Sequence, residues 1–300
     1  MDIRKVAVIG SGQMGTGVAQ VCARAGLETI LVKMTPGAVD AGKQKIGKAL
    51  KRDVEKQRCT EQEMQDTLGR LTCTARIEDL ADCDLVIESV IEDLAEKQQL
   101  LGRLDGIVKQ DGILATNTST LSVTALAEAT TRPERVIGLH FFNPAPVMKL
   151  VEIVPTLRTA PEVLAAAQAF TDTLKKTGVV IRDFTGFVVN RLLTPYMVDA
   201  MRTLQEGLAS VGSIDAAMQL GANHPMGPLA LADFIGLDIV FHMSSNLFEE
   251  YREARFTPPP LLRRLVLAGY LGRKSGKGFY DYSTTPPSPN DWLVGELGRA

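Results

Sequence analysis

The sequence predicts an α/β fold, in which a doubly wound, mostly parallel sheet is followed by an all-helical C-terminal domain. Short apolar runs of strand length alternate with helical patterns in the first half of the chain, as parallel βαβ units require. A glycine-rich turn joins the first run to the first helical pattern, and from Gly186 onward the pattern is almost entirely helical. With 300 residues, the chain has the length of two domains.

The strands and helices of the first domain are expected in alternation. The first strand is the run KVAVIG at residues 5–10, and the helical pattern after it closes at Gly26, a residue favoured just beyond helix ends. A second strand follows at residues 28–32. Later apolar runs predict strands at residues 85–90, 112–116, 136–142 and 150–154.

The second domain begins with the helical pattern GFVVNRLL at residues 186–193. Its helices are separated by the turn NHPMGP (223–228) and by FTPPP (256–260). We therefore assign residues 1–185 to a dinucleotide-binding domain, 186–284 to a helical substrate and dimerisation domain, and 285–300 to an extended, flexible tail. In the tail, Trp292, Leu293 and Leu297 are candidates for a short docked helix.

The composition excludes several classes of function. A net charge of −2 does not favour a nucleic-acid partner. No apolar stretch reaches the roughly 18 residues that span a membrane, and the start of the chain has no signal-peptide pattern. The four cysteines form no CxxC pair and no metal-ligand pattern with the three histidines. We expect a cytoplasmic protein with reduced thiols and no bound metal.

A dinucleotide-binding fingerprint lies directly after the first strand. Residues 10–15 read Gly10-Ser11-Gly12-Gln13-Met14-Gly15, which is G-x-G-x-x-G between a strand and a helix. Gly10 permits the tight turn, Gly12 lets the backbone approach a pyrophosphate, and Gly15 lets the helix pack closely on the strand. The alternative is a turn that needs glycines for its geometry alone. The fingerprint predicts a Rossmann-type domain, with phosphates at the helix N-terminus.

His140 and Glu152 are candidates for proton transfer. His140 lies near the carboxyl end of the strand that begins at Val136, where ligands bind in open α/β sheets. Oxidising an alcohol requires a base for the hydroxyl proton, and a neutral imidazole suits that role. Glu152 can fix the tautomer and stabilise the imidazolium if the two strands pair. The alternative is a core histidine beside an unrelated glutamate. Ser119, after the strand at 112–116, and Asn190, early in the first helix of the second domain, are further polar candidates.

These motifs together resemble the L-3-hydroxyacyl-CoA dehydrogenase family, particularly the short bacterial 3-hydroxybutyryl-CoA dehydrogenases. The resemblance covers residues 3 to about 282, including VIGSGQMGTGVAQ, ATNTSTLS, HFFNPAPVMKLVE and GRKSGKGFYDYS. It implies that His140 is the catalytic base with Glu152 as its partner, that Ser119 and Asn190 orient the substrate, and that the C-terminal domain mediates a homodimer. It also implies dinucleotide contacts at Glu92, Lys97, Asn143 and Lys277.

A basic segment suggests that the substrate carries coenzyme A. Residues 43–58 hold seven Lys or Arg and two acidic residues, a local charge of +5. At 100° per residue the segment is an amphipathic helix with Lys45, Lys48, Arg52 and Lys56 on one face. The alternative is a solvated basic surface. In the resemblance, Arg52 and Lys56 fall at positions that contact coenzyme A.

One expected cofactor residue is missing. An acidic residue usually ends the second strand of an NAD site and binds the ribose hydroxyls, but Lys33 stands there instead. Lys33 either points to solvent or, with Thr35, meets the 2′-phosphate of NADP. We expect NAD, with NADP also accepted. Two other functions stay open at this point: a dehydrogenase of a free hydroxy or sugar acid, which does not need Arg52 and Lys56, and a non-catalytic nucleotide-binding protein, in which His140 and Glu152 need not pair.

Overall fold

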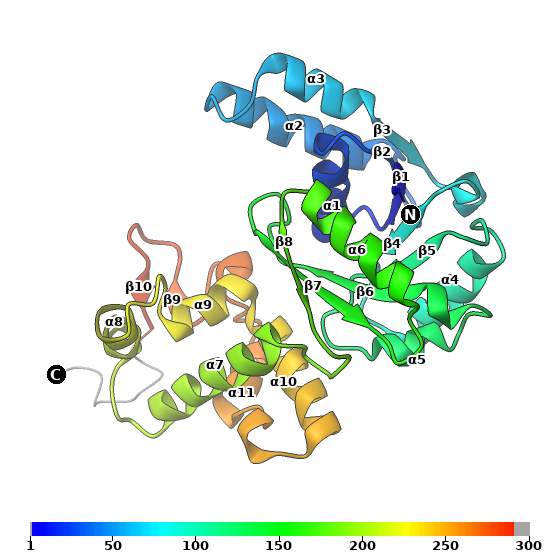
Figure 1. The fold of residues 1–300 in the computed structure, drawn as a ribbon. Coiled ribbons are helices and arrows are strands. Elements are labelled where there is room, and N and C mark those ends of the chain that lie inside the picture. Colours follow the sequence, from blue (N-terminus) through cyan, green and yellow to red (C-terminus); the bar gives the residue numbers. More distant parts are fainter. Residues whose placement is uncertain (1, 291–300) are drawn as a thin grey trace. The chain divides into compact units, whose positions relative to one another are not determined.

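The computed structural model describes residues 2–290, and the chain divides into two compact units between Phe184 and Thr185. The first unit is built on one eight-stranded sheet with the order β3-β2-β1-β4-β5-β6-β7-β8 (Figure 1). All neighbouring strands are parallel except β6 and β7. The strands are β1 (Lys5–Ile9), β2 (Glu28–Val32), β3 (Leu71–Thr74), β4 (Leu85–Glu88), β5 (Ile113–Thr116), β6 (Val136–Phe141), β7 (Leu150–Pro155) and β8 (Thr177–Val180).

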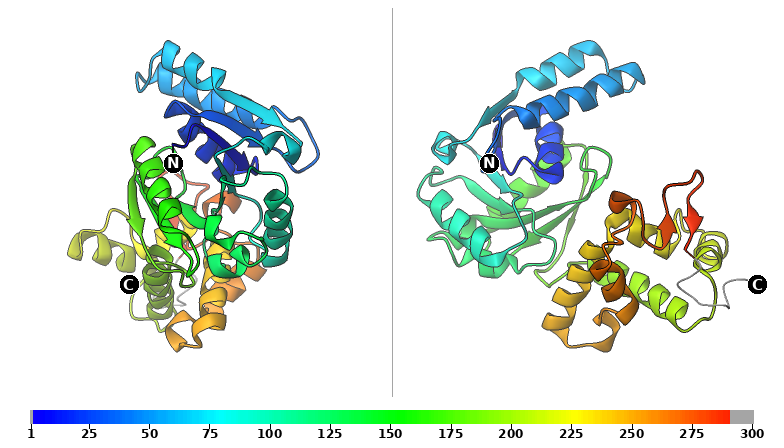
Figure 2. Two further views of the ribbon diagram at one scale, coloured as in Figure 1. Left: turned by 45° about the vertical axis from the view of Figure 1, so that its right-hand side comes forward. Right: turned by 180° about the vertical axis from the view of Figure 1, so that it is seen from behind.

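Helices cover both faces of this sheet, which confirms the predicted doubly wound fold. The helices are α1 (Gln13–Arg24), α2 (Ala41–Glu55), α3 (Glu61–Gly69), α4 (Leu94–Asp105), α5 (Val123–Ala127) and α6 (Pro161–Thr173), with the 3-10 turns η1 (Ile77–Leu80) and η2 (Pro133–Arg135). One core cluster joins the sheet to α1, α2 and α6, and a second joins it to α4 and α5. Figure 2 shows from two further sides that α2 and α3 lie side by side.

Alternation along the strands explains the two cores. Val6 and Val8 of β1 belong to the cluster under α1 and α6, whereas Ala7 and Ile9 belong to the cluster under α4 and α5. Successive side chains of a strand point to opposite faces, and a sheet covered on both faces needs apolar residues at every position. The run KVAVIG therefore specifies a central strand rather than a half-exposed one.

The sequence patterns missed two strands, both at sheet edges. β3 has the sequence LTCT, and β8 has the sequence TGVV with all four residues exposed. Neither has the length or the buried apolar content of the central strands. The predicted strand at residues 85–90 ends at Glu88 in the structure.

The second unit is helical, as predicted, with its own core around Met197, Met201, Leu229, Val240 and Phe279. Its elements are α7 (Val189–Gln205), α8 (Val211–Gly221), α9 (Pro228–Ile235), α10 (Leu237–Tyr251), η3 (Ala254–Phe256), α11 (Pro260–Leu267), η4 (Arg273–Ser275), β9 (Tyr280–Asp281) and β10 (Ser288–Pro289). No single helix between residues 2 and 290 is long and apolar enough to span a membrane; α9 and α10 reach that length only together, across a bend of 97°.

Within the segment predicted as a tail, β10 pairs antiparallel with β9, and Asn290 is buried with its amide donating to the carbonyl of Gly278. The candidate docking residues Trp292, Leu293 and Leu297 lie outside the described residues.

Candidate active site

The glycine fingerprint forms the turn between β1 and α1. Gly10 has a φ of 114°, and a Cβ there would clash with the carbonyl of Ser89. A Cβ on Gly15 would clash with the carbonyl of Gly10, so this position brings the helix onto the strand. Both glycines thus have the backbone roles that the sequence analysis assigned to them.

Gly12 leaves space for a ligand at the N-terminus of α1. A Cβ built on Gly12 would meet no atom within 4 Å. Gly12 is also the N-cap of α1, no side chain caps the helix, and no acidic residue lies in its first turn. The first backbone N–H groups and the positive end of the helix dipole are therefore available to an anion. These features fit the pyrophosphate of a dinucleotide.

The topology places the turn where such a ligand binds. β1 lies between β2 and β4, so the strand order reverses direction between β1 and β4. Ligands of open α/β sheets bind beyond the carboxyl ends of the strands at this reversal. Gly10 follows β1, and Glu88 ends β4 at the same point.

His140 and Glu152 face one another across two strands. Antiparallel pairing of β6 and β7 places the two residues directly opposite each other, and His140 Nδ1 lies 2.7 Å from Glu152 Oε2. The side chains are 5% and 1% exposed. The pairing on which the sequence argument depended is therefore present, and a buried carboxylate lies against the imidazole.

Ser119 contacts the other nitrogen of this ring. Its Oγ lies 3.1 Å from His140 Nε2. A carboxylate only accepts hydrogen bonds, so Nδ1 of the neutral ring donates to Glu152, and Nε2 accepts from the Ser119 hydroxyl. The arrangement fixes the tautomer and directs the basic nitrogen toward the side of the site that Ser119 occupies.

Glu92 holds the loop that carries Ser119. Its Oε1 accepts hydrogen bonds from Thr118 Oγ1 at 2.5 Å, Ser119 N at 2.8 Å and Thr120 N at 3.1 Å. Burial opposes the ionisation of Glu92, but Lys97 and these hydrogen bonds outweigh it and hold the pKa of the carboxyl below its ordinary value. Glu92 is therefore an anion that organises residues 118–120.

Lys97 is fully buried and pairs with two carboxylates. Its Nζ lies 2.9 Å from Glu88 Oε2 and 3.2 Å from Glu92 Oε2. The sequence analysis did not identify Glu88. A glutamate inside the apolar run LVIESV, with a lysine nine residues later, was the available indication, because a buried carboxylate requires a cation or hydrogen-bond donors.

Asn143 follows β6 in an exposed loop. The next residues of that loop approach α1: a Cβ on Gly17 would lie 3.2 Å from both Ala145 Cβ and Pro146 Cδ. Asn117 connects the neighbouring strand ends, since its amide donates to Ser89 Oγ and its oxygen accepts from Phe141 N. The loops after β1, β4, β5 and β6 therefore meet at the carboxyl ends of these strands.

The Lys33 ammonium contacts its own loop, and both interpretations of its role in cofactor choice stay predictions. Its ammonium donates to the carbonyls of Thr35 and Pro36 and to Thr35 Oγ1, at 2.8–3.0 Å. The side chain thus curls back over the loop after β2, where it also lies 3.5 Å from the position of a Cβ on Gly37. No acidic side chain ends β2.

The basic segment is helical, with an apolar side that packs on the sheet. Ile46 and Leu50 of α2 are buried, whereas the four cations Lys45, Lys48, Arg52 and Lys56 are exposed. α2 ends at Glu55, one turn earlier than predicted, so Lys56 is its C-cap residue. The cations of the predicted face are exposed on one side of the first unit.

Asn190 and Lys277 belong to the second unit. Asn190 is the second residue of α7. Lys277 lies between η4 and β9, with its ammonium 3.8 Å from Asp281 Oδ2 and 5.4 Å from the centre of the Tyr270 ring.

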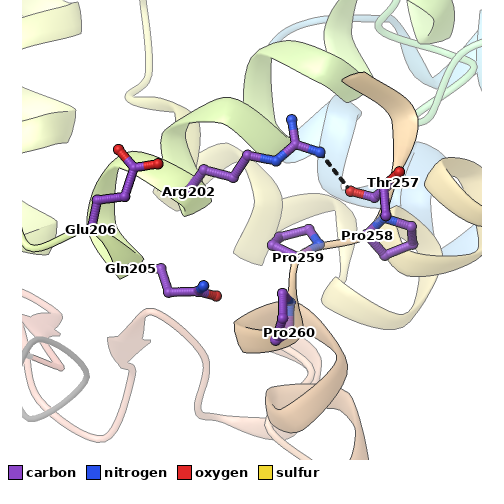
Figure 3. A pocket seen from close by; sticks show the side chains of 7 residues that line it. All are labelled: Arg202, Gln205, Glu206, Thr257, Pro258, Pro259 and Pro260. Atoms are coloured by element: carbon purple, nitrogen blue, oxygen red, sulfur yellow. Dashed lines mark hydrogen bonds between the residues drawn. The ribbon is translucent and has the colours of Figure 1, made fainter. Parts of the chain in front are cut away.

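Figure 3 shows a pocket in this unit in which Arg202 donates to the carbonyl of Thr257. None of the predicted site residues lines it.

Comparison with known proteins shows similarity over nearly the whole chain. Residues 5–184 match the NAD binding domain of 3-hydroxyacyl-CoA dehydrogenase, and residues 186–282 match its C-terminal domain. A 3-hydroxybutyryl-CoA dehydrogenase of Mycobacterium tuberculosis is 46% identical over 93% of this chain and 99% of its own. A probable 3-hydroxybutyryl-CoA dehydrogenase of Bacillus subtilis is 45% identical over 94% and 98%. The crystal structure of (S)-3-hydroxybutyryl-CoA dehydrogenase from Ralstonia eutropha superposes with a TM-score of 0.91, at 43% identity over 94% of this chain and 100% of that one.

Proposed function

The chain belongs to the 3-hydroxyacyl-CoA dehydrogenase family, and we propose that it interconverts a short L-3-hydroxyacyl-CoA, such as 3-hydroxybutyryl-CoA, and the matching 3-ketoacyl-CoA. It is an oxidoreductase with an NAD-binding domain. The observation that carries the proposal is the ring of His140, which contacts Glu152 through Nδ1 and Ser119 through Nε2. A ring held in this way presents Nε2 as the proton acceptor.

The reaction transfers a proton and a hydride, and the side chains of the site handle the proton. A bound nicotinamide would supply the acceptor or donor for the hydride at C3 of the substrate. His140 Nε2 takes the proton of the C3 hydroxyl, so that the carbon becomes a ketone and the ring an imidazolium. Glu152 stabilises that cation, and the buried setting strengthens the interaction. In the reverse direction, His140 returns the proton to the carbonyl oxygen.

Ser119 and Asn190 orient the oxygen at C3 in this proposal. Ser119 Oγ lies 3.1 Å from His140 Nε2, so a substrate hydroxyl that reaches this nitrogen also comes within reach of Ser119. Asn190 supplies an amide from the first turn of α7. Holding the oxygen near Nε2 lowers the entropic cost of proton transfer.

Arg52 and Lys56 bind the phosphate groups of coenzyme A in the proposal. Both are exposed, on α2 and at its C-cap. Phosphates accept charge-assisted hydrogen bonds from such side chains. A free hydroxy acid lacks these groups, so the basic surface favours an acyl-CoA over that alternative.

For the cofactor, we propose NAD, with weaker discrimination against NADP than an acidic residue at the end of β2 would give. That carboxylate would repel a 2′-phosphate, and Lys33 cannot. The Lys33 ammonium can exchange an oxygen of its own loop for a phosphate oxygen. Gly10, Gly12, Gln13, Met14 and Gly15 supply the phosphate turn, and Glu92, Lys97, Asn143 and Lys277 are proposed to lie at the nicotinamide half.

We also propose a homodimer through the helical unit. Four leucines of this unit, Leu192, Leu208, Leu220 and Leu267, are 67–87% exposed. A second copy that covered them would remove this apolar surface from water.

A spectrophotometric assay with acetoacetyl-CoA and NADH tests the proposed function. Wild type should oxidise NADH, and His140→Ala should lower kcat far more than it weakens NADH binding, because the imidazole acts on the transition state. His242→Asn, on α10, is the matched control and should leave kcat unchanged. Turnover of free acetoacetate but not of its thioester would instead support a hydroxy-acid dehydrogenase. No turnover of either would support the non-catalytic alternative.

A further inference from the structure

Glu88 and Lys97 form a buried ion pair beneath the candidate site. Glu88 is the last residue of β4 and Lys97 completes the first turn of α4; their side chains are 0% and 1% exposed. The ammonium lies 2.9 Å from each carboxylate oxygen of Glu88. Such a pair rarely improves stability relative to apolar residues, and a cation in the first turn opposes the helix dipole. Its position therefore calls for another role.

The pair is connected to the loop 118–120 through Glu92. One oxygen of Glu92 faces Lys97 at 3.2 Å, and the other accepts from Thr118 Oγ1 and from the backbone N–H groups of Ser119 and Thr120. The ammonium thus determines where the Glu92 carboxylate lies, and the carboxylate determines where the loop lies.

A second connection runs through Thr116. Its hydroxyl donates to Glu88 and accepts from Thr118 N at 3.2 Å. The ion pair therefore holds the loop at both ends, and the residue between these contacts is Ser119, whose Oγ lies 3.1 Å from His140 Nε2.

We propose that Glu88 and Lys97 are positioning residues: their ion pair fixes the ammonium against Glu92, and Glu92 holds Ser119 Oγ at His140 Nε2. The inference rests on the proposed function of His140 as the proton acceptor. Lys97 acts through Glu92, because its ammonium lies between two carboxylates and its side chain is buried. If Lys97 acted only by contacting the dinucleotide, its removal would raise the Kd of NADH and leave kcat at saturating NADH unchanged.

Two variants separate positioning from mere charge compensation. Lys97→Met removes the ammonium, and the double variant Glu88→Gln/Lys97→Met also removes the charge that the first leaves unpaired. Both should lower kcat for acetoacetyl-CoA, measured at saturating NADH, by at least about 10-fold. Saturation separates this loss from any change in the Kd of NADH, which is followed by fluorescence. Normal kcat in the double variant overturns the proposal. A raised Kd for NADH with a normal kcat at saturating NADH overturns it in favour of direct contact alone.

The pH profile is an additional measure. The Lys97 ammonium contributes to the lowered pKa of Glu92, so both variants should move the acid limb of kcat to higher pH. An acid limb that does not move counts against the proposal.

A second buried ion pair in the same unit is the matched control. Arg132 Nε lies 2.8 Å from Asp105 Oδ1, with side chains 6% and 9% exposed. Arg132→Met/Asp105→Asn should lower the free energy of unfolding without lowering kcat. If it lowers kcat as much as the variants of Glu88 and Lys97, the losses reflect general destabilisation and the proposal is overturned.

Histidine NMR tests the positioning without any substrate. The chain has three histidines, so nitrogen-15 labelling of histidine resolves His140. Its Nε2 resonance should shift in both variants, in the same direction as in Ser119→Ala. If it shifts while wild type fails to reduce acetoacetyl-CoA, the proposed function fails, but the positioning of Ser119 by the ion pair stands. If acetoacetyl-CoA is reduced and the resonance does not shift, the inference alone fails.

Discussion

His140 and Glu152 lie 12 residues apart in the chain, yet their side chains meet at 2.7 Å, because β6 and β7 pair with these two residues directly opposed. The contact depends on strand register, and a shift of one residue would turn one of the two side chains to the other face of the sheet. The geometry of the pair is thus set by backbone hydrogen bonds on both strands.

Glu152→Gln should keep the fold and lose activity. The amide can replace one hydrogen bond to Nδ1 but cannot balance an imidazolium, so kcat should fall by at least about 10-fold and the pH–rate profile should change. Glu128→Gln, an exposed glutamate that contacts Arg158, is the control. A wild-type rate with an unchanged profile would make Glu152 a structural residue.

Arg52→Ala and Lys56→Ala should raise the KM for acetoacetyl-CoA more than the KM for a pantetheine thioester that lacks the nucleotide. The KM for the full substrate should also rise with ionic strength, because salt screens exposed charges. Lys51→Ala serves as the control, since Lys51 is exposed on the same helix but outside the predicted basic face. Equal effects on both substrates would indicate a solvated surface with no role in binding.

Lys33→Asp should shift the ratio of kcat/KM for NADH to that for NADPH toward NADH by at least about tenfold, about 1.4 kcal/mol. The carboxylate would accept from ribose hydroxyls and repel a 2′-phosphate. Wild type should turn over measurably with NADPH. Parallel assays of wild type and variant with the two cofactors measure this ratio. If wild type already excludes NADPH as strongly as the variant does, Lys33 has no part in cofactor choice.

Light scattering at micromolar concentration should give about twice the monomer mass of 32.5 kDa. The exposed leucines of the helical unit supply the apolar surface that association would bury. A mass of one chain under these conditions would reject the homodimer.

Asp233 should make stability depend on pH in the mildly acidic range. Burial raises the pKa of this carboxyl to about 6, and the nearby Asp215 adds to the effect, although Phe279 N, Tyr280 N and the Tyr282 hydroxyl donate to it. The unfolded group titrates near 3.8. The folded state therefore binds the proton more tightly, and the contribution of this group is lost as pH rises from about 4 to about 6, by up to about 3 kcal/mol.

Urea unfolding of wild type and Asp233→Asn at several pH values measures this contribution. The amide cannot accept from all of these donors, so the variant should be less stable, but its stability should lack this pH dependence. The advantage of wild type over Asp233→Asn should therefore narrow as pH rises from about 4 to about 6. A constant or widening difference would contradict the prediction.

Much of the fold follows from local patterns in the sequence. The central strands β1, β2, β4, β5, β6 and β7 were predicted because buried strands need unbroken apolar runs. The edge strands β3 and β8 were missed, because an edge strand buries little apolar surface. The sequence TGVV, with all four residues exposed, has no apolar pattern that distinguishes it from a loop. Such strands form because a neighbouring strand already offers hydrogen-bonding groups.

By itself, the sequence determined what depends on neighbouring residues. These features are the glycine turn at 10–15, the helix with a basic face and an apolar face, and the placing of His140 near the end of one strand and of Ser119 after another. Only the tertiary structure decided which side chains meet. It paired His140 with Glu152, curled Lys33 onto its own loop, and buried Lys97 between Glu88 and Glu92. The physical reason is that these contacts depend on register and on the packing of segments that are distant in the chain, whereas periodicity and turn chemistry describe only residues close in sequence.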